Sequence, residues 1–169
     1  LNTSSRTVTI SGNTATFSGA MPDNVGVGDA LVYGSTYIAF ISGRTSSTVY
    51  TVQNATGGSP VAAAAGTSVG VYRSFNSLSN WEGNTTANSS IDAAVRGSVL
   101  VPTLDLVTWG HAVMAACYAD GVDSTSVTID GWTTGANNYI KVYTPVTVSE
   151  VGVSQRHGVN GTRANITYL

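Results

Sequence analysis

Charged side chains and cysteine are both scarce in this chain. Its 169 residues include 9 acidic and 7 basic groups, a single one of them Lys, and charged residues make up 9%, where an ordinary globular protein has about 25%. The net charge of −2 provides no basic field, so we expect no nucleic-acid partner. One cysteine excludes a framework of internal disulfides. No stretch approaches the roughly 18 apolar residues that a membrane span requires, so we expect none.

Residues that favour turns and strands are abundant. Ser and Thr together number 43, Gly 19 and Val 22. Val, Thr, Ile and Tyr fit pleated, half-buried surfaces, whereas Gly, Asn, Ser and Asp divide the chain into short segments. The composition therefore predicts an all-β protein. The scarcity of Lys and Glu favours a location outside the cytoplasm, and it removes the charges that usually keep a sheet edge from pairing with other chains.

Residues 1–73 predict a small β-barrel or β-sandwich. Polar and apolar residues alternate on both sides of a turn at 11–13, which predicts a hairpin over 7–17. Residues 36–41 are apolar on both faces, and we expect them to form a central strand. Further strands are expected at 30–33, 48–53 and 69–72.

Residues 74–98 predict a short helical connection. Apolar residues recur at every third position from Phe75 to Trp81, and Ser79 precedes Glu82 at capping-box spacing. We therefore expect one or two short helices in this segment.

Residues 99–169 return to strand-like patterns. Cys117, Ile129 and Val142 follow one another at intervals of 12 to 13 residues. This period is typical of a β-solenoid, whose coils stack strands in parallel, and an ordinary meander has it too. Strands are expected at 99–101, 104–109, 112–118, 126–129, 139–143 and 146–151.

Four segments of this region resemble the opening of right-handed parallel β-helix domains, which occur in large bacterial surface or secreted proteins. They are ACYADG at 116–121, VTIDGWTT at 127–134, NYIKVYTP at 138–145 and SQRH at 154–157. The small β-module that precedes the β-helix in such proteins resembles residues 20–28, 41–46 and 48–52. The resemblance implies β-helix-like strands over 99–169 and a surface location, and it implies no activity.

The sequence departs from that family in three places. A short turn at 34–37 replaces a longer acidic insertion, and the connection between Arg96 and Trp109 is compressed. The family's many further coils are not found within the 169 residues. A solenoid of one or two coils exposes its last strands and an apolar end. We therefore expect either that something else covers that end or that the long helix is not formed.

No catalytic constellation and no cofactor are expected. The sequence has no nucleophile elbow of the Gly-x-Ser-x-Gly type. Cys117 lies in an alternating apolar run, which predicts a buried core thiol. We expect His111 at a strand end and His157 in a turn-stabilising role. The sequence therefore predicts a protein that is not an enzyme.

Three aspartates and two tryptophans are candidates for binding sites. Asp120, Asp123 and Asp130 lie within eleven residues and are weak calcium candidates through their oxygen atoms, although Asp-Gly pairs are also typical of turns. Trp109 and Trp132 are candidates for a sugar-stacking surface, with core packing as the favoured alternative. One cysteine and two distant histidines are too few for a zinc site.

Asn-x-Ser/Thr sequons, the acceptor motif for N-glycosylation, occur six times. They begin at Asn2, Asn54, Asn84, Asn88, Asn160 and Asn165. This number is high even for a chain rich in Asn, Ser and Thr. In a surface protein these side chains are candidate attachment points for glycans.

Together these features favour a structural protein at the cell surface. We expect a filament or surface-layer subunit that binds copies of itself head-to-tail, by strand addition or by coil stacking. For strand addition, residues 1–17 and 162–169 are both candidates. The N-terminal segment is the expected exchanged element, with Thr7, Val8, Thr9 and Ile10 as assembly candidates. The alternatives are a carbohydrate-binding or carbohydrate-cleaving β-helix module, for which glycans would be the partners, and a virion or tail-fibre component.

Overall fold

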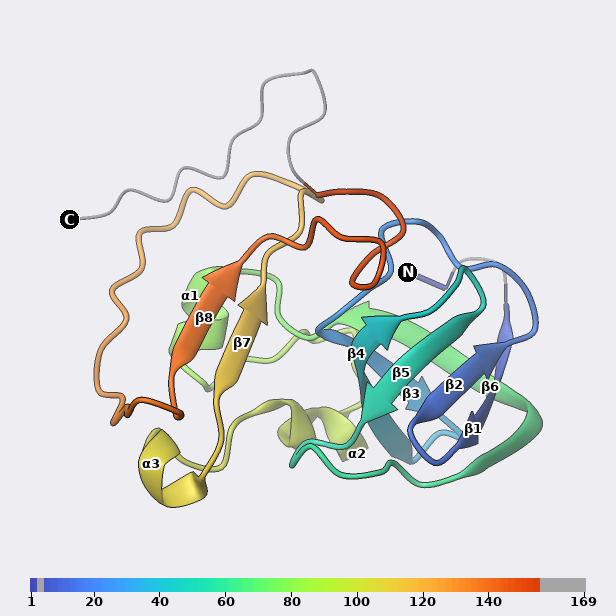
Figure 1. The fold of residues 1–169 in the computed structure, drawn as a ribbon, viewed down its shortest axis with the longest axis horizontal. Helices are drawn as coiled ribbons and strands as arrows, with labels where there is room; N and C mark the ends of the chain where they lie inside the picture. Colours follow the sequence, from blue (N-terminus) through green and yellow to red (C-terminus); the bar gives the residue numbers. More distant parts are fainter. Residues whose placement is uncertain (3–4, 156–169) are drawn as a thin grey trace.

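The first six strands form a closed antiparallel barrel in the computed structural model, which describes residues 1–2 and 5–155 (Figure 1). Around the barrel the order is β1-β2-β5-β4-β3-β6, and β6 pairs with β1 to close it. This arrangement confirms the all-β expectation and identifies the first module as a barrel. The strands are β1 Thr7–Ser11, β2 Thr14–Phe17, β3 Asp29–Tyr33, β4 Tyr37–Arg44, β5 Val49–Gln53 and β6 Ala63–Arg73.

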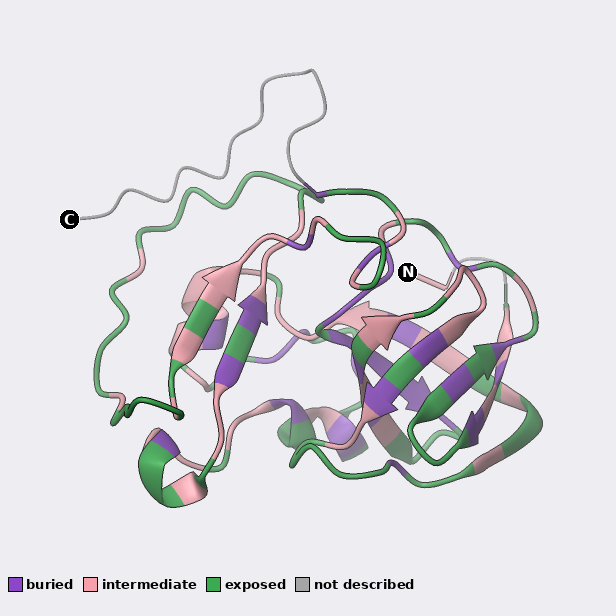
Figure 2. Ribbon diagram, viewed as in Figure 1, coloured by how far each residue is buried: buried purple, intermediate pink, exposed green. Residues whose placement is uncertain are grey.

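The first hairpin forms where alternation predicts it. Val8 of β1 lies opposite Phe17 of β2, and both side chains are buried. The two-residue connection begins at Gly12, whose φ of 55° lies in the left-handed region that glycine adopts at little cost. Figure 2 shows buried and exposed residues alternating along β2. Register and turn here both follow from local sequence.

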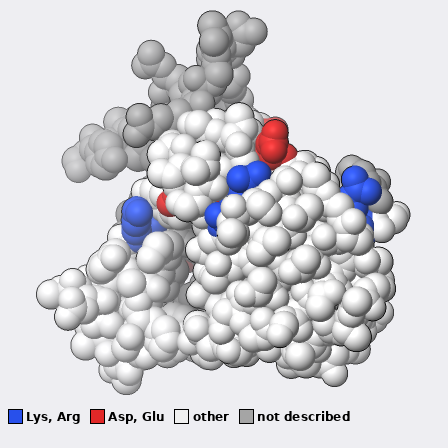
Figure 3. Space-filling model, turned by 45° about the vertical axis from the view of Figure 1, so that its right-hand side comes forward, with Lys and Arg blue, Asp and Glu red and all other residues white. Residues whose placement is uncertain are grey.

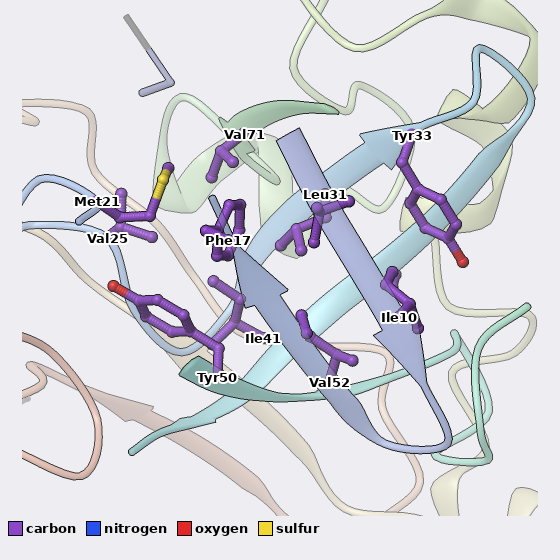
Figure 4. Close-up of a cluster of buried hydrophobic side chains, with 13 residues drawn as sticks. Ile10, Phe17, Met21, Val25, Leu31, Tyr33, Ile41, Tyr50, Val52 and Val71 are labelled. Atoms are coloured by element: carbon purple, nitrogen blue, oxygen red, sulfur yellow. The ribbon is translucent and has the colours of Figure 1, made fainter. Parts of the chain in front are cut away.

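All six strands contribute to the apolar core inside the barrel (Figure 4). Leu31 is completely buried, and the Phe17 ring meets the Tyr50 ring edge-on at a centroid distance of 5.5 Å. Full burial of a side chain of this size contributes about 1.5–3 kcal/mol. The core also includes Val8, Ile10, Ala15, Met21, Val25, Tyr33, Ala39, Ile41, Val52 and Val71.

The strand β3 is buried on both faces, because a second apolar cluster covers the outside of the barrel. Ala30 and Val32 of β3 belong to this cluster, together with Ile91 and Val95 from the segment that follows the barrel. The neighbouring strand β4 forms where a strand was expected from its apolar residues and lies between β3 and β5, as every strand of a closed barrel lies between two others. The strand buried throughout is β3.

Two short helices follow the barrel, as expected, but the first begins earlier than its capping signal indicates. Ser77 is the N-cap, and its hydroxyl accepts a hydrogen bond from the Asn80 amide at 3.1 Å. The expected capping pair of Ser79 and Glu82 is therefore wrong, because both residues lie inside the helix. The helices are α1 Leu78–Glu82 and α2 Ala93–Arg96, and a 3₁₀ turn over Gly97–Val99 follows α2.

The strand expected at 104–109 is wrong, because these residues contain the helix α3, Leu106–Trp109. Asp105 caps its start by accepting a hydrogen bond from the Thr108 amide at 2.9 Å. Gly110, with φ of 76°, ends it. Caps at both ends outweigh the strand propensity of the residues between them.

Two further strands, β7 Val113–Ala116 and β8 Ile140–Tyr143, pair in parallel. Val113 lies opposite Ile140, so the chain returns beside itself after a much longer interval than the expected 12 to 13 residues. The strands expected at 99–101, 126–129 and 146–151 are wrong, because no such strands form there. Within 1–2 and 5–155 this is the one parallel sheet, an isolated parallel bridge joins Asp105 to Thr133, and no solenoid is shown.

After β8 the chain returns to the barrel. Val151, 1% exposed, forms a backbone bridge with Gly26. The Val27 amide donates a hydrogen bond to the Glu150 carbonyl at 3.0 Å. A Cβ added at Gly26 would overlap that carbonyl oxygen, so the close approach requires glycine. The last described segment and the barrel therefore share one interface.

Candidate assembly interface

The β7–β8 sheet has one face packed on an apolar cluster. Val113 and Ala115 of β7 are buried in this cluster with Trp81 and Leu106. From β8, Ile140 and Val142 pack against the same cluster and stay partly accessible. The sheet therefore packs on the rest of the chain through one face. Whether each of its two edges is open depends on backbone hydrogen bonding.

Hydrogen bonding between the strands leaves one edge of β8 open. The Val113 amide donates to the Tyr139 carbonyl at 2.9 Å, and the Cys117 amide donates to the Tyr143 carbonyl at 2.7 Å. Residues of a parallel strand alternate between bonding one neighbour and bonding the other. The N–H and C=O groups of Ile140 and Val142 therefore point away from β7, where no described strand pairs with them.

The opposite edge of the sheet faces the barrel. A Cβ added at Gly28 would lie 3.4 Å from the Ala116 Cβ. The Tyr118 hydroxyl, two residues beyond β7, donates to the Val27 carbonyl at 2.7 Å. Figure 1 shows β7 on the barrel side of the sheet and β8 on the far side. The edge of β8 is therefore the edge of this sheet that lies away from the barrel and has no partner strand among the described residues.

The connection between β7 and β8 runs as an extended, exposed arc (Figure 1). Near its ends it is held to α1, because the Leu78 amide donates to Asp123 at 2.9 Å and the Asp130 amide donates to Glu82 at 3.3 Å. Between these anchors, residues 126–129 alternate polar and apolar side chains, and Ile129 is 43% exposed. The backbone of 126–129 makes no hydrogen bond to the described part of the chain.

A charged network joins the sheet to the barrel, with Arg73 at its centre. The Arg73 guanidinium pairs with the fully buried Asp29 at 2.5 Å and with Asp120 at 2.6 Å. It also lies 3.5 Å from the centroid of the Tyr118 ring. Asn24 donates to the second oxygen of Asp120 at 3.1 Å. One cation thus links the ends of β3 and β6 to the residues that follow β7.

The two carboxylates of this network have opposite pKa shifts. Burial raises the pKa of Asp29 to about 6, even though Arg73 favours its charged form. Burial also acts to raise the pKa of Asp120, but hydrogen bonds from Arg73 and Asn24 outweigh it and lower that pKa below its usual value. The groups are hydrogen-bonded to one another, so the arrangement is suited to joining two parts of the fold.

The three calcium candidates perform separate structural tasks. Asp120 pairs with Arg73, Asp123 accepts from the first amide of α1, and the Asp130 backbone bonds to Glu82. Within the described chain no three His, Cys, Asp or Glu side chains are grouped as a metal site would require.

The sugar-stacking candidates both pack against another ring. Trp132 stacks on Trp81 at 5.7 Å between centroids, and Trp109 stacks on His111 at 4.4 Å. His111 also contacts the Thr56 carbonyl through Nε2 at 3.1 Å. Both tryptophans therefore pack within the fold, which is the alternative expected beside sugar binding.

The remaining candidates lie as follows. Cys117 is half-buried, and burial raises the pKa of its thiol. The assembly candidates Thr7, Val8, Thr9 and Ile10 all lie in β1, which pairs with β2 on one side and β6 on the other. His157, Asn160 and Asn165 lie outside the described residues.

The Arg73 network carries no local sequence signal. Its partners Asp29 and Asp120 are 44 and 47 residues away along the chain. The one available hint is a charged residue, Asp29, at the start of a strand whose other four residues are all apolar. Such a residue needs a buried partner, but the sequence alone does not identify it.

No helix within the described residues is long and apolar enough to cross a membrane. No protein-family model matches the chain, and neither the curated proteins nor the solved structures include a significant match.

Proposed function

We propose that this chain is a structural subunit of an extracellular assembly, in which the open edge of β8 in one copy accepts residues 126–129 of the next. The observation that carries the proposal is the presence, on one chain, of a parallel strand edge and an extended segment with strand-like alternation, neither of which has a partner strand among residues 1–2 and 5–155. Strand addition of this kind uses main-chain hydrogen bonds for affinity and alternate side chains for specificity.

The side chains of the two elements are compatible in one parallel register. With Val127 beside Ile140, Ile129 falls beside Val142, and the apolar face of the sheet continues into the added strand. Asp130 is then brought near Lys141 of β8, so the added strand places a negative charge close to a positive one. Because donor and acceptor are different surfaces, the contact is heterologous, and such contacts generate rings or open filaments.

This contact differs from the exchange of β1 expected from sequence. Both edges of β1 are already hydrogen-bonded within the closed barrel, so donating Thr7 to Ile10 to a neighbour would require the barrel to open. The edge of β8 needs no such rearrangement. We therefore assign the intermolecular contact to the sheet and an internal structural role to the barrel.

Low charge supports an assembling subunit. Charged residues make up 9% of the chain, and Figure 3 shows a face on which Lys, Arg, Asp and Glu are few and scattered. Charges on edge strands normally prevent pairing between molecules, and β8 has the single charged residue Lys141. The same scarcity of charge supports a location outside the cytoplasm.

The test is a proline at an outward-facing amide. Val142→Pro removes an N–H that points away from β7 and keeps the bonds between β7 and β8. Met114→Pro is the matched control, since its amide points outward from the barrel-side edge of the same sheet. We expect filaments of the original chain by negative-stain electron microscopy, unchanged filaments of Met114→Pro and dispersed monomers of Val142→Pro.

Two results would overturn the proposal. One is a chain that stays monomeric by light scattering at millimolar concentration. The other is assembly of Val142→Pro to the same extent as the original chain. Circular dichroism and thermal unfolding of both proline variants establish that the monomer is folded.

A further inference from the structure

We infer that Asn54 is an acceptor for an N-linked glycan on the folded chain, whereas Asn2, Asn84 and Asn88 are occupied in structural roles. All four asparagines are described in the structure, and each begins an Asn-x-Ser/Thr sequon in the sequence. What distinguishes them is how strongly the side-chain nitrogen, Nδ2, is engaged in hydrogen bonds within the fold. This inference is independent of the proposed assembly contact.

The chemistry of attachment requires that nitrogen to be available. The Asn Nδ2 forms a bond to the anomeric carbon of an oligosaccharide carried on a polyprenyl pyrophosphate. The bond from that carbon to the pyrophosphate oxygen breaks, the lipid pyrophosphate leaves, and one Nδ2 proton passes to a base of the transferase. The product has a bulky substituent on Nδ2 and one fewer hydrogen to donate.

Asn84 and Asn88 do not meet this requirement. The Asn84 Nδ2 donates to the Val101 carbonyl at 2.8 Å, and its Oδ1 accepts from the Val101 amide at 2.9 Å. Asn88 is 8% exposed, and its Nδ2 donates to the Arg73 carbonyl at 2.8 Å. A glycan at either position would displace a good hydrogen bond that holds the segment after the barrel.

Asn2 is held in a similar way. Its Nδ2 donates both to the Val69 carbonyl at 2.8 Å and to the Arg6 carbonyl at 3.0 Å. Both hydrogens are therefore in use, and the first of these bonds fastens the N-terminus to β6. Substitution on this nitrogen would break at least one of the two bonds.

Asn54 lies in an exposed loop, and its nitrogen is almost free. Its Oδ1 accepts from the Thr56 amide, the Thr56 hydroxyl and the Gly58 amide at 2.9 to 3.0 Å, so the side chain is held through oxygen. Its Nδ2 makes a single long contact of 3.3 Å to the Ser59 carbonyl. Residues 55–59 are all exposed. Asn54 itself is half-buried; its side chain is held through its oxygen, and its nitrogen has the one long hydrogen bond to Ser59.

Two neighbours complete the site. Thr56, the third residue of the sequon, is exposed, and its hydroxyl has the Asn54 Oδ1 as its hydrogen-bond partner. Gly58 leaves space beside the nitrogen, because a Cβ added there would lie 3.1 Å from the Asn54 Nδ2. A side chain at residue 58 would crowd the atom that must react.

The experiment treats the purified, folded chain with an oligosaccharyltransferase that accepts Asn-x-Thr and with its lipid-linked oligosaccharide. Occupancy of each sequon is read by mass spectrometry of proteolytic peptides. We expect Asn54 to be at least ten-fold more occupied than Asn2, Asn84 or Asn88. The same chain unfolded in urea and diluted into the reaction should lose most of this preference.

Three variants sharpen the test. Thr56→Ser keeps the sequon and should keep the modification, whereas Thr56→Val removes the hydroxyl and should abolish it at Asn54. Gly58→Ala should reduce occupancy at Asn54 several-fold with the sequon intact. Equal occupancy of Asn84 and Asn54 on the folded chain overturns the inference. So does an Asn54 that is unmodified on the folded chain, whether or not the unfolded chain is modified.

Discussion

The barrel and the β7–β8 sheet differ in whether the edges of their strands are paired. In the barrel every strand has a partner on both sides, so no backbone edge is left for another molecule. The sheet has two strands, and the outer groups of β8 find no partner among the described residues. A closed unit can be stable alone, whereas a two-stranded sheet is stabilised by what packs on it or pairs with it.

The two regions also differ in how they are held. The barrel has a single enclosed core built from its six strands and from Met21 and Val25 of the loop between β2 and β3. The sheet depends on a cluster from α1 and α3, on the Arg73 network and on the return of residues 144–155 to the barrel. We therefore expect substitutions in the barrel core to affect the whole fold and substitutions in the sheet region to act locally or on assembly. The predictions below test this division, from the largest expected effect to the smallest.

Leu31→Ala should lower the free energy of unfolding by about 2–5 kcal/mol, because it removes a completely buried side chain and leaves a cavity in the barrel. Urea unfolding followed by circular dichroism measures the loss. Met114→Ala is the control on the sheet, where the side chain is 55% exposed, and it should change stability by less than about 0.5 kcal/mol. Similar losses for the two variants would remove the contrast between barrel and sheet.

Stability should fall as pH rises from about 4 to about 6. The unfolded chain releases the Asp29 proton near 3.8, whereas burial raises the pKa of Asp29 to about 6 in the folded chain. The folded chain therefore binds more protons in this window, and the loss is at most about 3 kcal/mol from this one group. The lowered pKa of Asp120 acts in the opposite direction and below this window. Urea unfolding at several pH values should show a shallower slope for Asp29→Asn, and equal slopes would contradict the assignment.

Gly26→Ala should destabilise the contact between the barrel and residues 144–155, because the added Cβ overlaps the Glu150 carbonyl. Overpacking of this kind costs about 1–3 kcal/mol. Limited proteolysis should show faster cleavage after β8, while the amides of the barrel strands keep their protection from hydrogen exchange. Gly121→Ala, at an exposed glycine with nothing near its Cβ, controls for the loss of glycine itself. Uniform loss of protection throughout the barrel would show that the two regions are a single cooperative unit.

Ile129→Thr should have the smallest effect on stability and a clear effect on assembly. The side chain is 43% exposed in the extended arc, so the free energy of unfolding should change by less than about 0.5 kcal/mol. Filament formation, measured by light scattering, should require a higher protein concentration, because an apolar contact beside Val142 is lost. Unchanged assembly with unchanged stability would remove residues 126–129 from the interface.

Local patterns predicted the barrel better than the rest of the chain. The hairpin around Gly12 and the strand β4 both follow from the alternation or continuity of apolar residues, and the structure contains both. Those strands lie close in sequence to their partners, so the local pattern that predicts each strand also predicts which strand it pairs with. Residues 126–129 have the same kind of alternation and yet form no strand, because strand formation needs a partner as well as propensity.

The errors in the second half have two physical causes. At 104–109 the strand propensity was outweighed by caps, Asp105 at one end and Gly110 at the other, and both were visible in the sequence. The Arg73 network was not visible, because Asp29 and Asp120 are brought to it by the closure of the barrel and the parallel return of the chain. Contacts between residues so far apart in sequence depend on the whole fold.

Hydrogen exchange at the four amides of β8 tests the central claim most directly. In the dispersed chain, the inward-facing amides of Lys141 and Tyr143 should be protected, and the outward-facing amides of Ile140 and Val142 should exchange rapidly. In the assembled material all four should be protected. Outward amides that are already protected in the monomer, or that still exchange rapidly in the assembly, would contradict strand addition at this edge.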